Sequence, residues 1–212
     1  MNKKTFQATL AIVTFFTILF ADQIIKIAVK THMYLHESIR VTNWFYILFT
    51  ENPGMAFGWE FLNKFFLSSF RILAIAFIGI YLYRIIKSCK YQSGYVFCLA
   101  LIMAGAAGNV IDCMFYGLIF NNPIPPMTAD FVPFGTGYDG FLLGKVVDMF
   151  YFPIIDIDCM PSWVPFVGGE RFIFFSPIFN FADAAISCGI VAMLIFYRKY
   201  LTKKDTVEKV EE

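Results

Sequence analysis

The chain has 212 residues, of which 58% are hydrophobic and 16% are charged, and Phe alone occurs 27 times. Soluble domains carry roughly 45–50% apolar and about 25% charged residues, so this composition excludes an ordinary cytosolic enzyme, a coiled coil and intrinsic disorder. The formal net charge is only +1, and the sequence has no basic patch that would bind nucleic acid. The sequence therefore predicts a single integral membrane domain over residues 1–212.

Four mostly apolar stretches are long enough to cross a hydrocarbon core as helices, which takes about 17–25 residues. They lie at about residues 6–27, 65–86, 95–111 and 177–197. The first follows two lysines as a secretory signal does, but no small-x-small cleavage site ends it, and Asp22 and Lys26 occur within it at helical spacing. We therefore expect an uncleaved first helix and an all-α membrane protein with four transmembrane helices.

Basic residues gather on one side of this predicted arrangement. They precede the first helix, follow the second and follow the fourth: Lys3, Lys4, Arg84, Lys87, Lys90, Arg198, Lys199, Lys203 and Lys204. Because cytoplasmic loops carry an excess of Lys and Arg, we expect both termini in the cytoplasm. The two long connections, at about 31–64 and 112–176, then face outward.

These outer loops contain short structured pieces and one irregular segment. The alternation from Arg40 to Phe45 predicts a short strand. The stretch 121–144 resembles an insertion, since its Pro and Gly residues exclude regular helix or strand. Asp156 and Asp158 are expected to be solvated loop residues.

Ionisable and amide side chains occur inside the predicted spans, where each needs a partner or a role. They are Asp22, Lys26, Arg71, Asn109, Asp112, Asn180 and Asp183. In the predicted topology, the polar groups of the first, third and fourth helices fall at one depth, toward the outer face. Arg71 is expected to snorkel or to pair with an aspartate. The common depth indicates an assembled site.

The spacing of these residues adds a second constraint. Asn109 and Asp112 are three residues apart, as are Asn180 and Asp183, so each pair shares one helix face. Asp22 and Lys26 are four residues apart and can form an ion pair. Asp148 lies in an apolar piece of the outer loop that can fold back to the helix ends.

The reactive groups that remain as candidates are carboxylates in a low-dielectric environment. His32 and His36 lie in a polar connection without a metal-ligand or nucleophile pattern, so no metal site is expected. Two aspartates forced together share one proton, and the ionised one can activate water against an amide carbonyl. Two alternatives fit the same residues: a small transporter or channel with an intramembrane carboxylate site, and a scaffold subunit with a structural polar cluster.

Five motifs, taken in chain order, resemble those of lipoprotein signal peptidase (signal peptidase II), a family of bacterial intramembrane aspartic proteases. They are Asp22–Lys26, Asn52–Gly58, Gly105–Asp112, Val146–Asp148 and Phe179–Ile186. The resemblance implies cleavage of a signal peptide immediately before a diacylglyceryl-modified cysteine, with Asp148 and Asp183 as the catalytic pair. It assigns supporting or substrate-binding positions to Asp22, Lys26, Asn52, Gly54, Asn109, Asp112 and Asn180.

The resemblance also implies an outward-facing cradle of short strands, no metal or organic cofactor, and a site toward the outer face of the cytoplasmic (inner) membrane. The expected partners are lipid-modified prolipoproteins and membrane lipids, and a monomer is the simplest assembly.

Three positions depart from the family pattern. Cys113 stands where the family usually has Arg, so we expect another cation, such as Lys145 or Arg171, to supply the ion pair. Pro53 stiffens the loop before Gly54. The long segment before Asp148 weakens the spacing argument for that residue, which leaves Asp112 as an alternative member of the pair.

Overall fold

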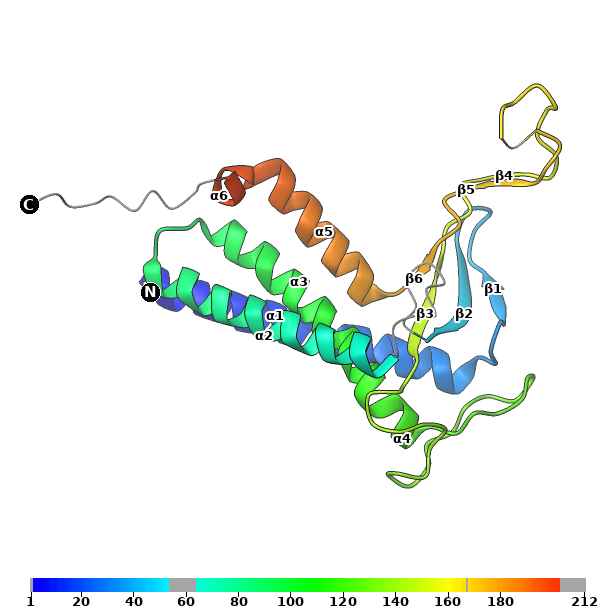
Figure 1. Ribbon diagram of the computed structural model, residues 1–212, viewed down its shortest axis with the longest axis horizontal. Coiled ribbons are helices and arrows are strands. Elements are labelled where there is room, and N and C mark those ends of the chain that lie inside the picture. Colours follow the sequence, from blue (N-terminus) through cyan, green and yellow to red (C-terminus); the bar gives the residue numbers. More distant parts are fainter. Residues whose placement is uncertain (1, 54–63, 167, 203–212) are drawn as a thin grey trace, which may run out of the picture.

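The computed structural model describes residues 2–53, 64–166 and 168–202, and it combines a bundle of helices with a small sheet at one end (Figure 1). Within these residues, three helical runs are long and apolar enough to cross a membrane. They are α1 (Lys3–His32), α2 (Lys64–Ser88) and the run Ser93–Ile119. The first two contain the predicted stretches 6–27 and 65–86 and extend beyond them.

The third helical run continues past its predicted end at residue 111. It begins as α3 (Ser93–Ile111), passes through the π-helical turn η1 (Asp112–Tyr116) and ends as α4 (Gly117–Ile119). The expectation that an outer loop begins at residue 112 is therefore wrong. Asp112 lies within a helix, on a π-helical turn of the kind that often occurs at functional sites.

The fourth predicted stretch, at 177–197, contains a shorter helix than expected. Residues 178–179 form strand β6 (Ile178–Phe179), and α5 (Phe181–Phe196) begins only after Asn180, whose side chain caps it. The short helix α6 (Arg198–Thr202) follows. At 16 residues, α5 is shorter than the other three runs, so four complete spans remain a prediction.

A four-stranded antiparallel sheet adjoins the helix ends, in the order β1-β2-β3-β6. Its first three strands are β1 (Ser38–Arg40), β2 (Tyr46–Asn52) and β3 (Val146–Tyr151). The strand predicted from Arg40 to Phe45 is wrong beyond Arg40, because residues 41–45 form the connection between β1 and β2, where Trp44 N donates to Thr42 Oγ1 at 3.3 Å. A second, two-stranded sheet pairs β4 (Ile155–Ile157) with β5 (Phe172–Phe174).

The register of β2 against β3 sets the directions of their side chains. Thr50 lies opposite Asp148, and Glu51 lies opposite Val147. Because side chains alternate between the two faces of a sheet, Asn52 shares the face of Asp148, while Glu51 shares that of Val147 and of Lys145, the residue just before β3.

Two hydrophobic clusters support this arrangement. One lies among the helices, around Tyr95, Leu99 and Met193. The other lies under the sheet, where Phe49, Val147 and Met149 pack against the end of α1 and against Tyr116 and Phe120. Helix α3 contacts α1, α2 and α5, so it forms the centre of the bundle. Asp148 therefore projects from a strand that is buried on both faces.

Two segments extend from the end of the molecule that carries the sheet (Figure 1). The segment 121–144 contains no regular helix or strand among its residues, as its composition predicts. The β4–β5 ribbon is the other. Asp156 belongs to it and pairs with Arg171 at 2.6 Å, so its expected role as a solvated loop residue is wrong in part. Asp158 is almost fully exposed, with a side chain 98% accessible.

Candidate active site

Asn180 connects the two aspartates expected to be catalytic. Its amide Nδ2 donates to Asp148 Oδ1 at 2.6 Å, and its Oδ1 accepts from the backbone N–H of Asp183 at 2.9 Å. The Asp183 carboxylate accepts in return from the backbone N–H of Asn180 at 3.3 Å, which completes a capping box at the start of α5. The end of β3 and the first turn of α5 are thus held together through one fully buried side chain.

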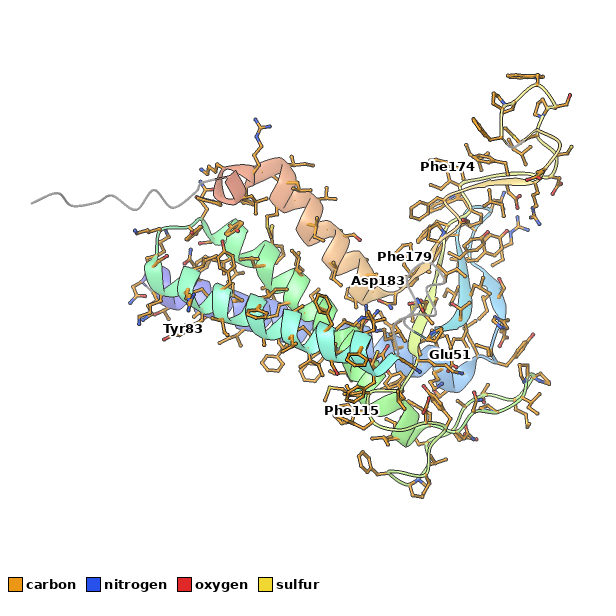
Figure 2. The ribbon with its side chains drawn as sticks, in the orientation of Figure 1. Glu51, Tyr83, Phe115, Phe174, Phe179 and Asp183 are labelled. Carbon is orange, nitrogen blue, oxygen red and sulfur yellow. The ribbon has the colours of Figure 1, made fainter. Side chains whose placement is uncertain are left out.

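Asn109 of α3 joins the same network. Its Nδ2 donates to Asp183 Oδ1 at 2.8 Å, and its Oδ1 accepts from Asn180 Nδ2 at 3.1 Å. Figure 2 labels Asp183 at the end of α5 that faces the sheet. Residues from β3, α3 and α5 therefore converge at one level of the molecule.

Lys26 of α1 lies behind this network, with 0% of its side chain exposed. Its Nζ lies 2.9 Å from Asp22 Oδ2 and 2.8 Å from Asp112 Oδ2, and both of these carboxylates are also completely buried. The same Nζ donates to Asn109 Oδ1 at 2.8 Å. The ammonium group therefore links the ion pairs to the asparagine that holds Asp183.

The two buried carboxylates also accept hydrogen bonds from the backbone. Asp22 Oδ1 accepts from the N–H of Ala182 at 2.9 Å, in the first turn of α5. Asp112 Oδ2 accepts from the N–H of Val147 at 3.3 Å, next to Asp148. Each one thus fixes a segment that carries one of the two aspartates.

The electrostatics of Asp148 differ from those of an ordinary surface carboxyl. Burial and the neighbouring charge of Asp183 raise its pKa to about 7, against the opposing effects of the hydrogen bonds from Asn180 and Asn52 and of the Lys26 charge. Only 5% of Asp148 is exposed. A carboxyl of this kind keeps its proton to a higher pH than a surface aspartate does.

Most of the residues expected at the site therefore lie together. Asp22, Lys26, Asn109, Asp112 and Asn180 contact one another or the pair Asp148 and Asp183. Asn52 hydrogen-bonds to Asp148 from the facing strand. Gly54 lies outside the described residues. Asp112, the alternative member of the pair, is bound by Lys26 on the far side of this network.

The expected replacement for the missing Arg is wrong. The cation beside Asp112 is Lys26, because Lys145 pairs with Glu51 at 2.9 Å and Arg171 pairs with Asp156. Arg71 donates to Cys113 Sγ at 3.5 Å, and no ion pair joins it to an aspartate among the residues that the structure describes.

Sequence reasoning missed several supporting residues. Gln23 donates to Asp112 Oδ1 at 2.9 Å and accepts from Tyr116 OH at 3.2 Å, and its place within the first motif was the available signal. Glu51 is held between Lys30 and Lys145 on the opposite face of the sheet. Although burial favours its neutral form, the two lysines outweigh that effect and lower the pKa of Glu51.

Comparisons with known proteins agree with these motifs. The family model for signal peptidase (SPase) II matches residues 14–199. A lipoprotein signal peptidase of Porphyromonas gingivalis is 49% identical over 180 residues, which are 85% of this chain and 79% of that protein. One of Amoebophilus asiaticus is 34% identical over 196 residues, which are 90% of this chain and 77% of that protein.

A solved structure described as a bacterial membrane enzyme, at 1.9 Å resolution by the in meso method, has a similar fold. It aligns over 92% of this chain and 94% of the other, with a TM-score of 0.59 and 23% sequence identity. At that identity the likeness bears on the fold alone. The family model and the two relatives each cover most of the chain, and the chain therefore belongs to the signal peptidase II family.

Proposed function

We propose that this chain is an intramembrane aspartic endopeptidase, which removes the signal peptide of diacylglyceryl-modified prolipoproteins immediately before the lipidated cysteine. Membership of the signal peptidase II family supports the coarser part of this function, a membrane peptidase that processes lipoprotein precursors. The observation that carries the aspartic mechanism is the connection of Asp148 to Asp183 through Asn180.

In this mechanism the two carboxyl groups share one proton. Asp148 is the protonated member of the pair, a role favoured by burial and by the charge of Asp183, which raise its pKa to about 7. Asp183 is the ionised partner and takes a proton from the attacking water, whose oxygen bonds to the amide carbon as Asp148 protonates the carbonyl oxygen. When the tetrahedral diol collapses, the C–N bond breaks, the leaving nitrogen takes the proton from Asp183, and a hydroxyl proton returns to Asp148.

The remaining site residues hold this pair in place. Asn109 and Asn180 orient the two carboxylates, and Lys26 with Asp22 and Asp112 fixes the ends of α5 and β3. Asn52, and by its place in the motif Gly54, are proposed to contact the substrate backbone on the exposed side of Asp148. No step uses a metal or an organic cofactor.

The proposed topology places the site near the outer face of the bacterial cytoplasmic membrane, with four spanning helices and both termini in the cytoplasm. The distribution of charge supports it, because Lys3, Lys87 and Lys199 lie on helix ends remote from the aspartates. A lipid-anchored precursor reaches such a site from the outer leaflet. We propose that one copy of the chain is sufficient, because Asp148 and Asp183 belong to the same chain.

The test is cleavage of a synthetic diacylglyceryl-modified precursor by purified protein in detergent. We expect Asp148→Asn and Asp183→Asn each to lower the rate by at least about 10³-fold, in the range found for loss of catalytic groups. Asp112→Asn and the exposed control Asp130→Asn should retain measurable cleavage. Cleavage that survives in both of the first two variants overturns the aspartic mechanism.

The transporter or channel alternative predicts a different outcome. It expects solute flux through liposomes that contain the protein and no cleavage of the lipidated precursor. A scaffold subunit predicts that neither aspartate affects any assay. Both alternatives are rejected if cleavage depends on Asp148 and Asp183.

A further inference from the structure

The end of the bundle remote from the aspartates carries a groove between α1 and α2. Its volume is about 360 Å³, which falls within the roughly 300–1,000 Å³ that is typical of ligand pockets. Phe15 and Phe16 of α1 form one wall, and Leu82 of α2 forms the other. Figure 2 labels Tyr83, another lining residue, toward the end of the helical bundle opposite to the one where Asp183 meets the sheet.

The groove deepens where α2 has no side chain. Gly79 lies on its lining, and a Cβ added there would meet only Met103 Sδ of α3, at 3.6 Å. Few side chains attach α2 to the rest of the protein, since its buried residues are Ser68, Leu82 and Ile85. The apolar walls of this groove thus lack a protein partner along the α1–α2 contact.

The charged side chains that line the groove are all basic. Lys4 and Lys87 line it, one from the first turn of α1 and the other from the last turn of α2. The described residues of this half of the bundle, 2–18, 76–104 and 189–202, include no Asp or Glu. A ligand complementary to the groove therefore has a long apolar part and a negative charge at its polar end.

We propose that this groove binds one glycerophospholipid with an anionic headgroup. An acyl chain lies between Phe16 and Leu82, and the phosphate lies between the ammonium groups of Lys4 and Lys87. A free inorganic anion does not use the apolar walls, and a lipid without net charge leaves the positive charge of the two ammonium groups uncompensated at the membrane surface. The bound lipid supplies the packing that α2 lacks against α1. The site is separate from the aspartates and does not depend on their proposed chemistry.

Native mass spectrometry of the delipidated, full-length protein tests this proposal. Phosphatidylglycerol and phosphatidylcholine with identical acyl chains are titrated in turn, and the fraction with one lipid bound is measured. We expect phosphatidylglycerol to bind at least about tenfold more tightly, because it brings a net negative charge to the two lysines, whereas the choline cation of phosphatidylcholine cancels the charge of its phosphate. The double variant Lys4→Gln, Lys87→Gln should lose this preference and still bind both lipids weakly.

Two further variants separate a specific site from general attraction. Arg84→Gln with Lys90→Gln removes the same charge from the same end of α2 without touching the groove lining, and it should keep the preference. Gly79→Leu fills the groove and should weaken the binding of both lipids. Equal affinity of the two lipids for the wild type, or equal loss of preference in the two double variants, overturns the proposal.

Discussion

Asn180 and Asp148 are joined by a hydrogen bond of 2.6 Å from amide Nδ2 to carboxylate Oδ1, although 32 residues separate them in the sequence. The same asparagine caps α5 through its Oδ1, 2.9 Å from the backbone nitrogen of Asp183. One side chain therefore has two separable tasks, capping a helix and holding a carboxyl group, and each uses a different atom.

Asn180→Ser separates these tasks. Serine is a good helix cap, so the melting temperature should fall only slightly. The donor to Asp148 is lost. Because Asp148 becomes charged as it protonates the carbonyl oxygen, and a hydrogen bond to a charged group contributes about 1.5–3 kcal/mol, kcat should fall roughly 10- to 100-fold. The Asn180 hydrogen bond lowers the pKa of Asp148, so the alkaline limb of the pH–rate profile, expected near pH 7 in the wild type, should move to higher pH.

Asn180→Ala is the matched comparison, because it removes the cap together with the donor. It should lose about 1 kcal/mol more of the free energy of unfolding than the serine variant. If the serine variant keeps the wild-type rate and the wild-type pH profile, Asn180 acts as a cap alone.

Asp148 should make the protein less stable as the pH rises. The folded state raises its pKa from 3.8 to about 7, so the folded protein binds more protons than the unfolded chain between these values. The free energy of unfolding then falls by up to about 1.4 kcal/mol per pH unit across that window. Asp148→Asn removes this loss, and its melting temperature relative to the wild type should be higher at pH 8 than at pH 5. A difference that does not vary with pH contradicts the raised pKa.

Local patterns in the sequence predicted most of the helical stretches and which polar residues lie close together. The spacing of Asp22 and Lys26 predicted their ion pair, which the structure confirms at 2.9 Å. The polar residues near the helix ends were expected to lie at one depth, and Asn109, Asp112, Asn180 and Asp183 do lie in one network. These predictions succeeded because helical periodicity and helix direction fix where such side chains lie.

Contacts made by the pairing of segments that lie far apart in the sequence could not be predicted. Lys145 and Glu51 are 94 residues apart, and only the register of β2 against β3 brings them together. The alternation from Arg40 to Phe45 has the period of a strand, yet the chain turns there, because a short apolar and polar alternation does not distinguish a strand from a hairpin connection. The start of α5 was misplaced for a similar reason, since β6 pairs with β3 just before the Asn180 cap.

Lys26→Met should destabilise the protein strongly. The variant leaves the carboxylates of Asp22 and Asp112 buried without their shared cation, and loss of one partner from a buried ion pair costs about 3–5 kcal/mol. Thermal unfolding in detergent measures the effect. Lys90→Met, at an exposed position, is the control and should stay near the wild type. A melting temperature for Lys26→Met equal to that of the control contradicts the role of the triad.

Tyr138 should anchor the segment 121–144 to the sheet. Its ring lies 5.2 Å from Lys30 Nζ and 5.3 Å from Lys145 Nζ, and its hydroxyl accepts from the N–H of Lys145 at 2.8 Å. Tyr138→Phe loses only the hydroxyl contact, for about 1 kcal/mol. Tyr138→Leu also loses both cation–π contacts, which should lower the free energy of unfolding by roughly 1–3 kcal/mol more. Phe134→Leu, at a residue 72% exposed, should leave the melting temperature unchanged. Because the two lysines hold Glu51 beside Asn52, the leucine variant should also slow cleavage. A loss of stability without any loss of cleavage rate would show that Tyr138 contributes to packing alone.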